Sequence, residues 1–424
     1  MTLPKAINYK IYIFLLIFSS TISAQNNDSF LNESYFFTPE ILLGKTLEAN
    51  TLFPKTDLQK NLFLSIGKYN FNPQKEWAAR LNYPSTGISL GYTDFGNTDK
   101  VGRAYSVMPF MEFSILKSVF SHNLKLNIGI GGSYMDTQYN AETNPFNRAI
   151  TTKINWSFRS FIYYTFVNGK NTDWRFGLGY LHHSNGHTSL PNQGLNSLAT
   201  SISARFSKVK ETVDFEKPKF SSKSHTYISS RIGLGQNVLS EKFNTKKEVY
   251  SFSASAGKII NNTFKFGGGF YYRYYEHYYD YIKNNEVLVE EQYPHFRDNP
   301  YGYATNFGLF ATSELLMDHF GFEFDLGLNI YKPFYKIDWK LNQGYTYQNA
   351  NDETIEVLGD LDWYYEIKRT VSARMGLKYY LWSTSKAPKH NIFIGAHINA
   401  NLGQADFTEL SLGYVYRFNL KSKE

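Results

Sequence analysis

A histidine and a serine two residues apart form the strongest chemical signal in the sequence. They lie in the segment Tyr180–Ser197, which reads YLHHSNGHTSLPNQGLNS. Large apolar side chains alternate with small or polar ones from Trp174 onward, so His182 and Ser184 share the face of the apolar side chains. Asn196 has the parity of the apolar residues on the strand that follows. The three polar groups are therefore expected on one apolar, outward face.

Polar side chains on an apolar surface are unfavourable, because no water satisfies their hydrogen bonds there. A serine beside a histidine, with a third polar group that orients the imidazole ring, is the arrangement that activates a hydroxyl nucleophile. We therefore predict that His182, Ser184 and Asn196 are the catalytic residues of an esterase-type site. For the flanking His183 and His187, the sequence favours a structural role over a metal site.

The elements that must position these residues are long strands of period two. Residues 124–130 (LKLNIGI) place four aliphatic side chains on one face, and residues 320–330 (FGFEFDLGLNI) extend the same alternation. Strands of about ten residues, with one apolar face and one small or polar face, are typical of transmembrane β-barrels. The strands of soluble sandwiches average about five or six residues. We therefore expect an all-β fold, a transmembrane antiparallel β-barrel of the outer membrane.

The composition agrees with a barrel. Among 424 residues, 18% are aromatic but only 42% are hydrophobic, and there is no cysteine. The lack of cysteine excludes a disulfide scaffold and a cysteine nucleophile. In a membrane barrel, tyrosine and phenylalanine gather at the two bilayer interfaces, where a ring can be half apolar and half hydrated.

The first 24 residues have the pattern of an export signal. Lys5 and Lys10 precede the apolar run Ile11–Phe18, and the small residues of Ser19–Ala24 follow it. Such a run is too short to span a bilayer as a helix. We predict a signal peptide at 1–24, and hence a protein exported to the bacterial outer membrane.

The remaining sequence divides into two similar halves. About sixteen strand candidates are present, and the polar, lysine-rich stretch 208–223 separates a half at 25–207 from a half at 224–424. We favour a single barrel of about 14 to 16 strands, with two tandem eight-stranded barrels as the alternative. Laying Gly395–Asn401 on Gly179–Asn185 puts Ile398 at the histidine position and Ala400 at the serine position. The second half is therefore expected to be a catalytically silent repeat.

The chemical segment resembles a known family. The run His182-x-Ser184-Asn185, followed by Pro191-Asn192-x-Gly194, is similar to the active-site segment of outer-membrane lipid A 3-O-deacylases of the PagL type. Members of that family are eight-stranded barrels that remove an ester-linked acyl chain from lipid A. The resemblance covers the first half of the chain.

The resemblance implies roles for individual residues. It implies Ser184 as the nucleophile and His182 as the general base. The backbone amides of Asn185 and Gly186 become candidates for the oxyanion hole, with Asn192 as a supporting polar residue. The family's acidic third member falls on Asn196. An amide there can still hold the histidine tautomer, but it cannot stabilise an imidazolium as a carboxylate would, which implies either reduced activity or a relay through another group.

These observations together predict a carboxylic ester hydrolase that acts on lipid A of lipopolysaccharide in the outer leaflet. The formal net charge of +7 suits a surface that faces anionic lipid phosphates, and nothing indicates nucleic acid. The expected mechanism needs no metal and no organic cofactor. The alternatives are a non-enzymatic barrel, porin or structural, and an outer-membrane phospholipase with the same Ser–His logic.

Overall fold

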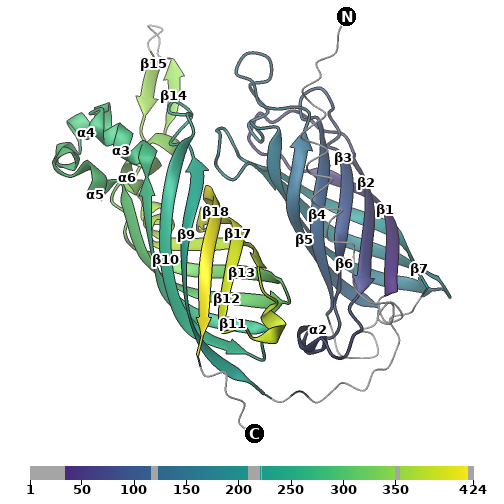
Figure 1. The fold of residues 1–424 in the computed structure, drawn as a ribbon. Helices are drawn as coiled ribbons and strands as arrows, with labels where there is room; N and C mark the ends of the chain where they lie inside the picture. The colour runs from purple at the N-terminus through teal and green to yellow at the C-terminus, as the bar shows by residue number, and fades with distance from the viewer. Residues whose placement is uncertain (1–33, 116–122, 209–219, 221, 349–353, 419–424) are drawn as a thin grey trace, which may run out of the picture.

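The computed structural model describes residues 34–115, 123–208, 220, 222–348 and 354–418. The predicted signal peptide at 1–24 lies outside the described residues, as does most of the predicted linker at 208–223. The described chain forms two closed, eight-stranded antiparallel barrels that stand side by side (Figure 1). The prediction of an all-β barrel fold is confirmed.

Consecutive strands are neighbours in both barrels, apart from a small two-stranded sheet that is inserted in the second. The strands of the first barrel are β1 (Ser34–Thr46), β2 (Gln59–Tyr69), β3 (Ser85–Asp94), β4 (Arg103–Ser114), β5 (Leu124–Met135), β6 (Ile154–Asn168), β7 (Thr172–Ser184) and β8 (Leu195–Ser207). The strands of the second are β9 (Ser224–Asn237), β10 (Lys247–Ile260), β11 (Phe264–Tyr275), β12 (Thr305–Met317), β13 (Phe320–Tyr331), β16 (Val371–Tyr380), β17 (His390–Asn401) and β18 (Gln404–Arg417).

The single large barrel that we favoured from the sequence is wrong, and the alternative of two tandem eight-stranded barrels is correct. The first barrel closes where β8 pairs with β1, with Ile41 opposite Ile202. The second closes where β18 pairs with β9, with Leu412 opposite Ile232. Alternation along a strand is the same in either arrangement, because closure depends on which distant strand an edge finds as its partner.

The outward faces of both barrels are apolar. On β2, for example, Leu62, Leu64 and Ile66 are exposed, while the residues between them are buried in the lumen. The same alternation runs along β18, where Leu410 and Leu412 point outward. This pattern is the reverse of a soluble protein and matches a barrel whose outside contacts lipid.

The lumens are filled by charged side chains that neutralise one another. In the first barrel, Arg159 lies 2.9 Å from Glu40, and the Tyr163 hydroxyl donates to the same carboxylate. In the second, Arg374 lies 2.9 Å from Glu409. Eight strands give an interior just wide enough for side chains to fill, so these pairs occupy the space that a wider barrel leaves to water.

The two ends of the barrels differ. The end that carries the predicted site has long connections, such as 136–153 and 185–194 in the first barrel and 276–304 and 332–370 in the second. These hold α3 (Glu276–Lys283), α4 (Val287–Glu291), η2 (Pro294–Asp298), α5 (Pro300–Tyr303), α6 (Tyr335–Asn342), α7 (Trp363–Thr370), β14 (Tyr345–Gln348) and β15 (Thr354–Val357). The opposite end carries α2 (Glu76–Arg80) and η3 (Thr384–Lys386).

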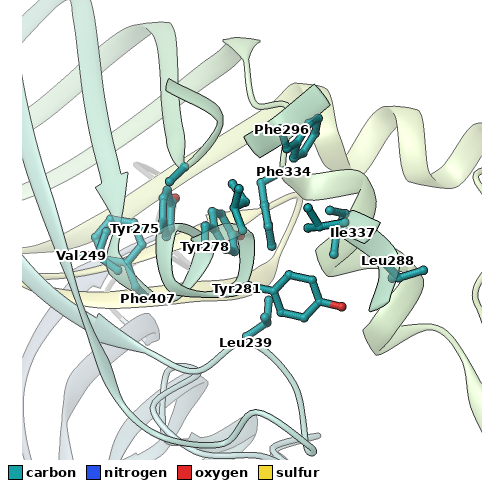
Figure 2. Close-up of a cluster of buried hydrophobic side chains, with 13 residues drawn as sticks. Leu239, Val249, Tyr275, Tyr278, Tyr281, Leu288, Phe296, Phe334, Ile337 and Phe407 are labelled. Carbon is teal, nitrogen blue, oxygen red and sulfur yellow. The ribbon is translucent and has the colours of Figure 1, made fainter. Parts of the chain in front are cut away.

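The helices over the second barrel pack on an aromatic cluster (Figure 2). Tyr278 stacks on Phe334 with ring centroids 4.2 Å apart, and Tyr275 stacks on Tyr278 at 4.6 Å. The tyrosine-rich run at 270–281 therefore passes from β11 into a buried core beneath the helices, which makes this rim a packed structure. None of the helices among the described residues has both the length and the apolar character that a membrane crossing requires.

Candidate active site

The predicted site lies where β7 ends and β8 begins. Ser184 is the last residue of β7, and His182 stands directly opposite Asn196 in the antiparallel register. Phe176 and Leu178 are exposed on the same face of β7. The structure therefore places the three predicted catalytic side chains on the outer surface of the first barrel, at the rim with the long connections.

Asn196 holds the imidazole of His182 in one orientation. Asn196 Oδ1 lies 2.8 Å from His182 Nδ1, and it also accepts a hydrogen bond from the Tyr180 hydroxyl. Because an amide oxygen only accepts, His182 donates through Nδ1–H and keeps Nε2 as its basic nitrogen. The Tyr180 and His182 rings are nearly parallel, with an interplanar angle of 11°.

Tyr180 is a member of the site that the sequence analysis missed. Its hydroxyl fixes which end of the Asn196 amide faces the histidine, since the phenol donates to the oxygen. By alternation alone, Tyr180 belongs with the apolar side chains of the outward face. Its position two residues before His182, on the same face, was the signal that could have found it.

Two donors converge on the Ser184 hydroxyl. The backbone N–H of Gly186 lies 3.2 Å from Ser184 Oγ, and the Asn192 side-chain amide lies 3.1 Å from it. The backbone N–H of Asn185 instead donates to Asn192 Oδ1 at 3.1 Å. The Asn185 N–H thus orients the Asn192 side chain. Asn192 and the Gly186 N–H both donate to the serine oxygen.

The connection from 185 to 194 is shaped by its own side chains. Asn185 Nδ2 donates to the carbonyl of Ser189 at 2.8 Å, and Asn185 Oδ1 accepts from the backbone N–H of Thr188. Gly194 has φ +75°, and a Cβ there would come within 2.9 Å of the His182 ring. The glycine of the Pro191-Asn192-x-Gly194 pattern is therefore needed for both its backbone conformation and the space beside the histidine.

The arrangement is poised for nucleophilic chemistry without a preformed Ser–His bond. Among the described residues, no hydrogen bond joins His182 to Ser184, and the serine oxygen is held by Gly186 and Asn192. Catalytic hydrogen bonds are often long in an unliganded enzyme and shorten in the substrate complex. Ser184 is 9% exposed, so only a substrate that enters between the surrounding groups reaches its hydroxyl.

The two flanking histidines point to different places. His183 is buried in the lumen, where its Nδ1 lies 2.8 Å from Ser157 Oγ and its ring meets Phe95 edge-on. His187 lies against the rim of the second barrel and lines a small cavity there with Asp338 and Asp406. His183 is thus packed in the lumen, whereas His187 borders a cavity between the two barrels.

The second barrel has a counterpart of this strand pair. β17 and β18 are its seventh and eighth strands, as β7 and β8 are in the first. Ile398 stands opposite Thr408 there, and the connection between the strands is only the pair 402–403. Neither a histidine nor a serine occupies the outward positions 398 and 400.

A family model matches most of the first barrel. Residues 66–205 match the model of the lipid A 3-O-deacylase (PagL) family. This match runs from β2 into β8 and includes every predicted site residue. It confirms the resemblance that was drawn from the short motif around Ser184, and it leaves the second barrel outside the matched region.

Several solved structures are also similar. A crystal structure of the outer membrane enzyme PagL is 17% identical, with a TM-score of 0.26, and the match covers 39% of this chain and 97% of that one. The transport unit of the Escherichia coli autotransporter AIDA-I is 10% identical over 96% of this chain and 97% of that one, with a TM-score of 0.13. OccK5 of Pseudomonas aeruginosa is 9% identical over 92% and 98%, with a TM-score of 0.18. The search of curated proteins gave no match.

Proposed function

We propose that this protein is an outer-membrane serine esterase that removes an ester-linked acyl chain from lipid A of lipopolysaccharide. The observation that carries the proposal is the strand pair β7–β8, where an oriented histidine and a serine held by two donors lie on the outside of the barrel. The candidate residues of that strand pair, from His182 to Asn196, lie inside the region that matches the deacylase family model. An ester in the outer leaflet would meet the barrel at this height and on this face.

In the proposed first step, His182 Nε2 accepts the proton of Ser184 as Oγ attacks the carbonyl carbon of the ester. The negative charge that develops on the carbonyl oxygen is stabilised by the Gly186 N–H and the Asn192 side-chain amide, which lie within 3.2 Å of Ser184 Oγ and hence beside the carbon that Oγ attacks. The intermediate then expels the sugar oxygen, which takes the proton from His182. An acyl-serine remains.

In the second step, water attacks the acyl-serine and gives its proton to His182, and the fatty acid leaves as Ser184 Oγ recovers a proton. Asn196 keeps the ring in place through both steps, and Tyr180 keeps the Asn196 amide in place. Asn185 orients Asn192 through its backbone N–H. The missing carboxylate leaves the imidazolium less stabilised than in a Ser–His–acid triad, so a slow enzyme is expected.

The filled lumens favour an enzyme over a porin. A conducting porin needs a water-filled channel, which is usual in barrels of about 16 strands or more. Here each barrel has eight strands, and ion pairs such as Arg205–Glu112 (2.7 Å) lie across the lumen. The second barrel, which lacks the serine and histidine, is proposed to be catalytically silent.

The proposal is tested on lipid A extracted from cells that express the wild type, Ser184→Ala or the control Ser189→Ala. Mass spectrometry should show loss of one hydroxyacyl mass with the wild type and the control, and none with Ser184→Ala. Ser189 lies in the same connection and contributes to it through its backbone carbonyl. Identical lipid A from all three strains would reject the proposal. If lipid A stays intact and lysophospholipid forms in a manner that depends on Ser184, the protein is a phospholipase instead.

A further inference from the structure

The second barrel touches the catalytic segment of the first. The Thr408 hydroxyl on β18 accepts a hydrogen bond from Trp156 Nε1 on β6 at 3.1 Å, and it lies 3.5 Å from the Gly186 carbonyl oxygen, to which it donates. Gly186 has φ +66°, and a Cβ there would overlap the Thr408 hydroxyl. The glycine two residues after the proposed nucleophile is therefore packed directly against a residue more than two hundred positions away.

A second set of contacts lies a few residues further along the same connection. Asn244, in the segment between β9 and β10, binds both backbone groups of Leu190: it accepts from the N–H at 2.9 Å and donates to the carbonyl at 2.6 Å. The backbone N–H of Val238 donates to the His187 carbonyl at 3.2 Å. Arg148 of the first barrel also pairs with Glu241.

These contacts hold both ends of a short stretch, from Gly186 to Leu190, and also its second residue, His187. The stretch is not part of a strand or helix, and the Asn185 side chain makes two of its hydrogen bonds within the first barrel. An oxyanion donor lowers a barrier only if it is already in place when charge develops, because reorientation during the reaction costs free energy. Something must therefore keep the Gly186 N–H fixed.

We propose that the second barrel is a positioning element for the active site: Thr408 and Asn244 fix the segment 186–190, and with it the Gly186 N–H that faces Ser184. The catalytic part of this inference rests on the proposed esterase function, whereas the bracing of the segment does not. It gives the catalytically silent barrel a role in the reaction of its neighbour. It also accounts for a glycine at 186, since a Cβ there would overlap the Thr408 hydroxyl.

Thr408 lies at the position of the second barrel that corresponds to Asn196 in the first. It stands opposite Ile398, as Asn196 stands opposite His182 in the first barrel. Thr408, the counterpart of the histidine-orienting Asn196, thus contacts the segment of the other barrel that carries Gly186. The face that carries the site in one barrel and the corresponding strand of the second are in contact at this point.

The test compares Thr408→Val, which keeps the shape but removes the hydroxyl, with Asn244→Ala and with the conservative Thr408→Ser. Thr226→Val is the matched control, because Thr226 is exposed on β9 of the same barrel, near its opposite end. All proteins are the full chain in detergent, and their folding is checked by the resistance of the barrels to unfolding in unheated SDS. Two quantities are measured: amide hydrogen exchange at 186–190, and hydrolysis of both lipid A and a soluble fatty-acyl ester.

Thr408→Val and Asn244→Ala should speed exchange at 186–190 about tenfold or more. They should lower kcat by roughly 10- to 100-fold with little change in KM, because substrate binding is untouched while the donor is displaced. Thr408→Ser should restore both quantities, and Thr226→Val should change neither. Unchanged exchange in folded variants overturns the bracing, and faster exchange with unchanged kcat overturns the positioning role.

The two proposals fail in different ways. A wild type that shows no Ser184-dependent hydrolysis of either ester defeats the esterase function. In that case the exchange measurement still decides whether the second barrel holds the segment. A wild type that cleaves the soluble ester but not lipid A corrects the substrate and leaves the positioning test fully in force.

Discussion

The rims at β7–β8 and β17–β18 occupy the same place in two barrels of the same strand number. On the first, His182 faces Asn196 across the strand pair and Ser184 follows. On the second, Ile398 faces Thr408 and Ala400 follows. The two rims therefore differ in side-chain type at the three positions that carry the candidate site in the first barrel.

The connections differ more than the strands. Ten residues, 185–194, join β7 to β8, and two residues, 402–403, join β17 to β18. The longer connection supplies Asn192 and the Gly186 N–H, the two donors at Ser184 Oγ. The site in the first barrel thus depends on the length of its connection as well as on its histidine and serine.

The lumens, by contrast, are built alike. Each holds a buried glutamate between two arginines: Glu112 with Arg175 and Arg205, and Glu409 with Arg231 and Arg374. Charge neutralisation inside the barrel is a requirement of the fold, since an unpaired buried charge is strongly destabilising. The paired charges that the fold requires lie inside and are present in both barrels. The histidine, the serine and their polar neighbours lie at one rim and are present only in the first barrel.

The largest effect is expected from moving the nucleophile. Ser184→Ala should lower turnover by at least about 10³-fold, because the covalent step is lost. Adding Ile398→His and Ala400→Ser to Ser184→Ala should restore nothing, since the two-residue turn 402–403 has no counterpart of Asn192 and is too short to place one beside residue 400. Release of fatty acid from lipid A measures both. Activity from the grafted second barrel would show that the side chains suffice and that the connection is dispensable.

The next effect concerns the connection itself. Asn192→Ala removes one of the two donors at Ser184 Oγ and should reduce kcat by about 10²- to 10³-fold. Gln193→Ala is the control, because the neighbouring side chain is exposed and the rest of the connection is unchanged. Steady-state kinetics with a soluble acyl ester would measure the two variants. Equal rates for Asn192→Ala and Gln193→Ala would mean that the connection serves only to link the strands.

A smaller effect is expected at Asn196, the position whose counterpart is Thr408. Asn196→Ala should lower kcat by about 10²-fold, because the His182 ring loses the group that fixes its tautomer. Asn196→Asp should instead raise kcat above that of the wild type, since a carboxylate stabilises the imidazolium that forms during attack. Kinetics on the three proteins would decide. If Asn196→Asp is slower than the wild type, the amide is not a weakened form of an acidic third member.

The sequence predicted what depends on local alternation. The outward parity of His182, Ser184 and Asn196 follows from a period of two along each strand, and the cross-strand contact of the first with the third then follows from the pairing of neighbours. The apolar exterior and charged lumen follow from the same periodicity. These features need no knowledge of distant contacts.

What the sequence did not predict depends on partners far away in the chain. Alternation does not say whether β8 returns to β1 or continues into β9, so the single barrel was favoured wrongly. The contact of Thr408 with Gly186 and the two bonds of Asn244 to Leu190 join separate barrels, and no local pattern marks them. Tyr180 was missed for another reason: its ring fits an apolar face, and only its hydroxyl partner reveals its second role.

The smallest effect is expected from that hydroxyl. Tyr180→Phe keeps the ring beside His182 but removes the donor to Asn196 Oδ1, so the amide can turn its nitrogen toward the histidine. One neutral hydrogen bond contributes about 0.5–1.5 kcal/mol, which corresponds to a loss of roughly twofold to 13-fold in kcat. Tyr164→Phe, on the exposed face of β6, is the control. In an Asn196→Ala background Tyr180→Phe should have no further effect, because its partner is already gone. An additional loss there would assign Tyr180 a direct role at the ester, and the difference between the two rims would then include an aromatic hydroxyl that acts on the substrate.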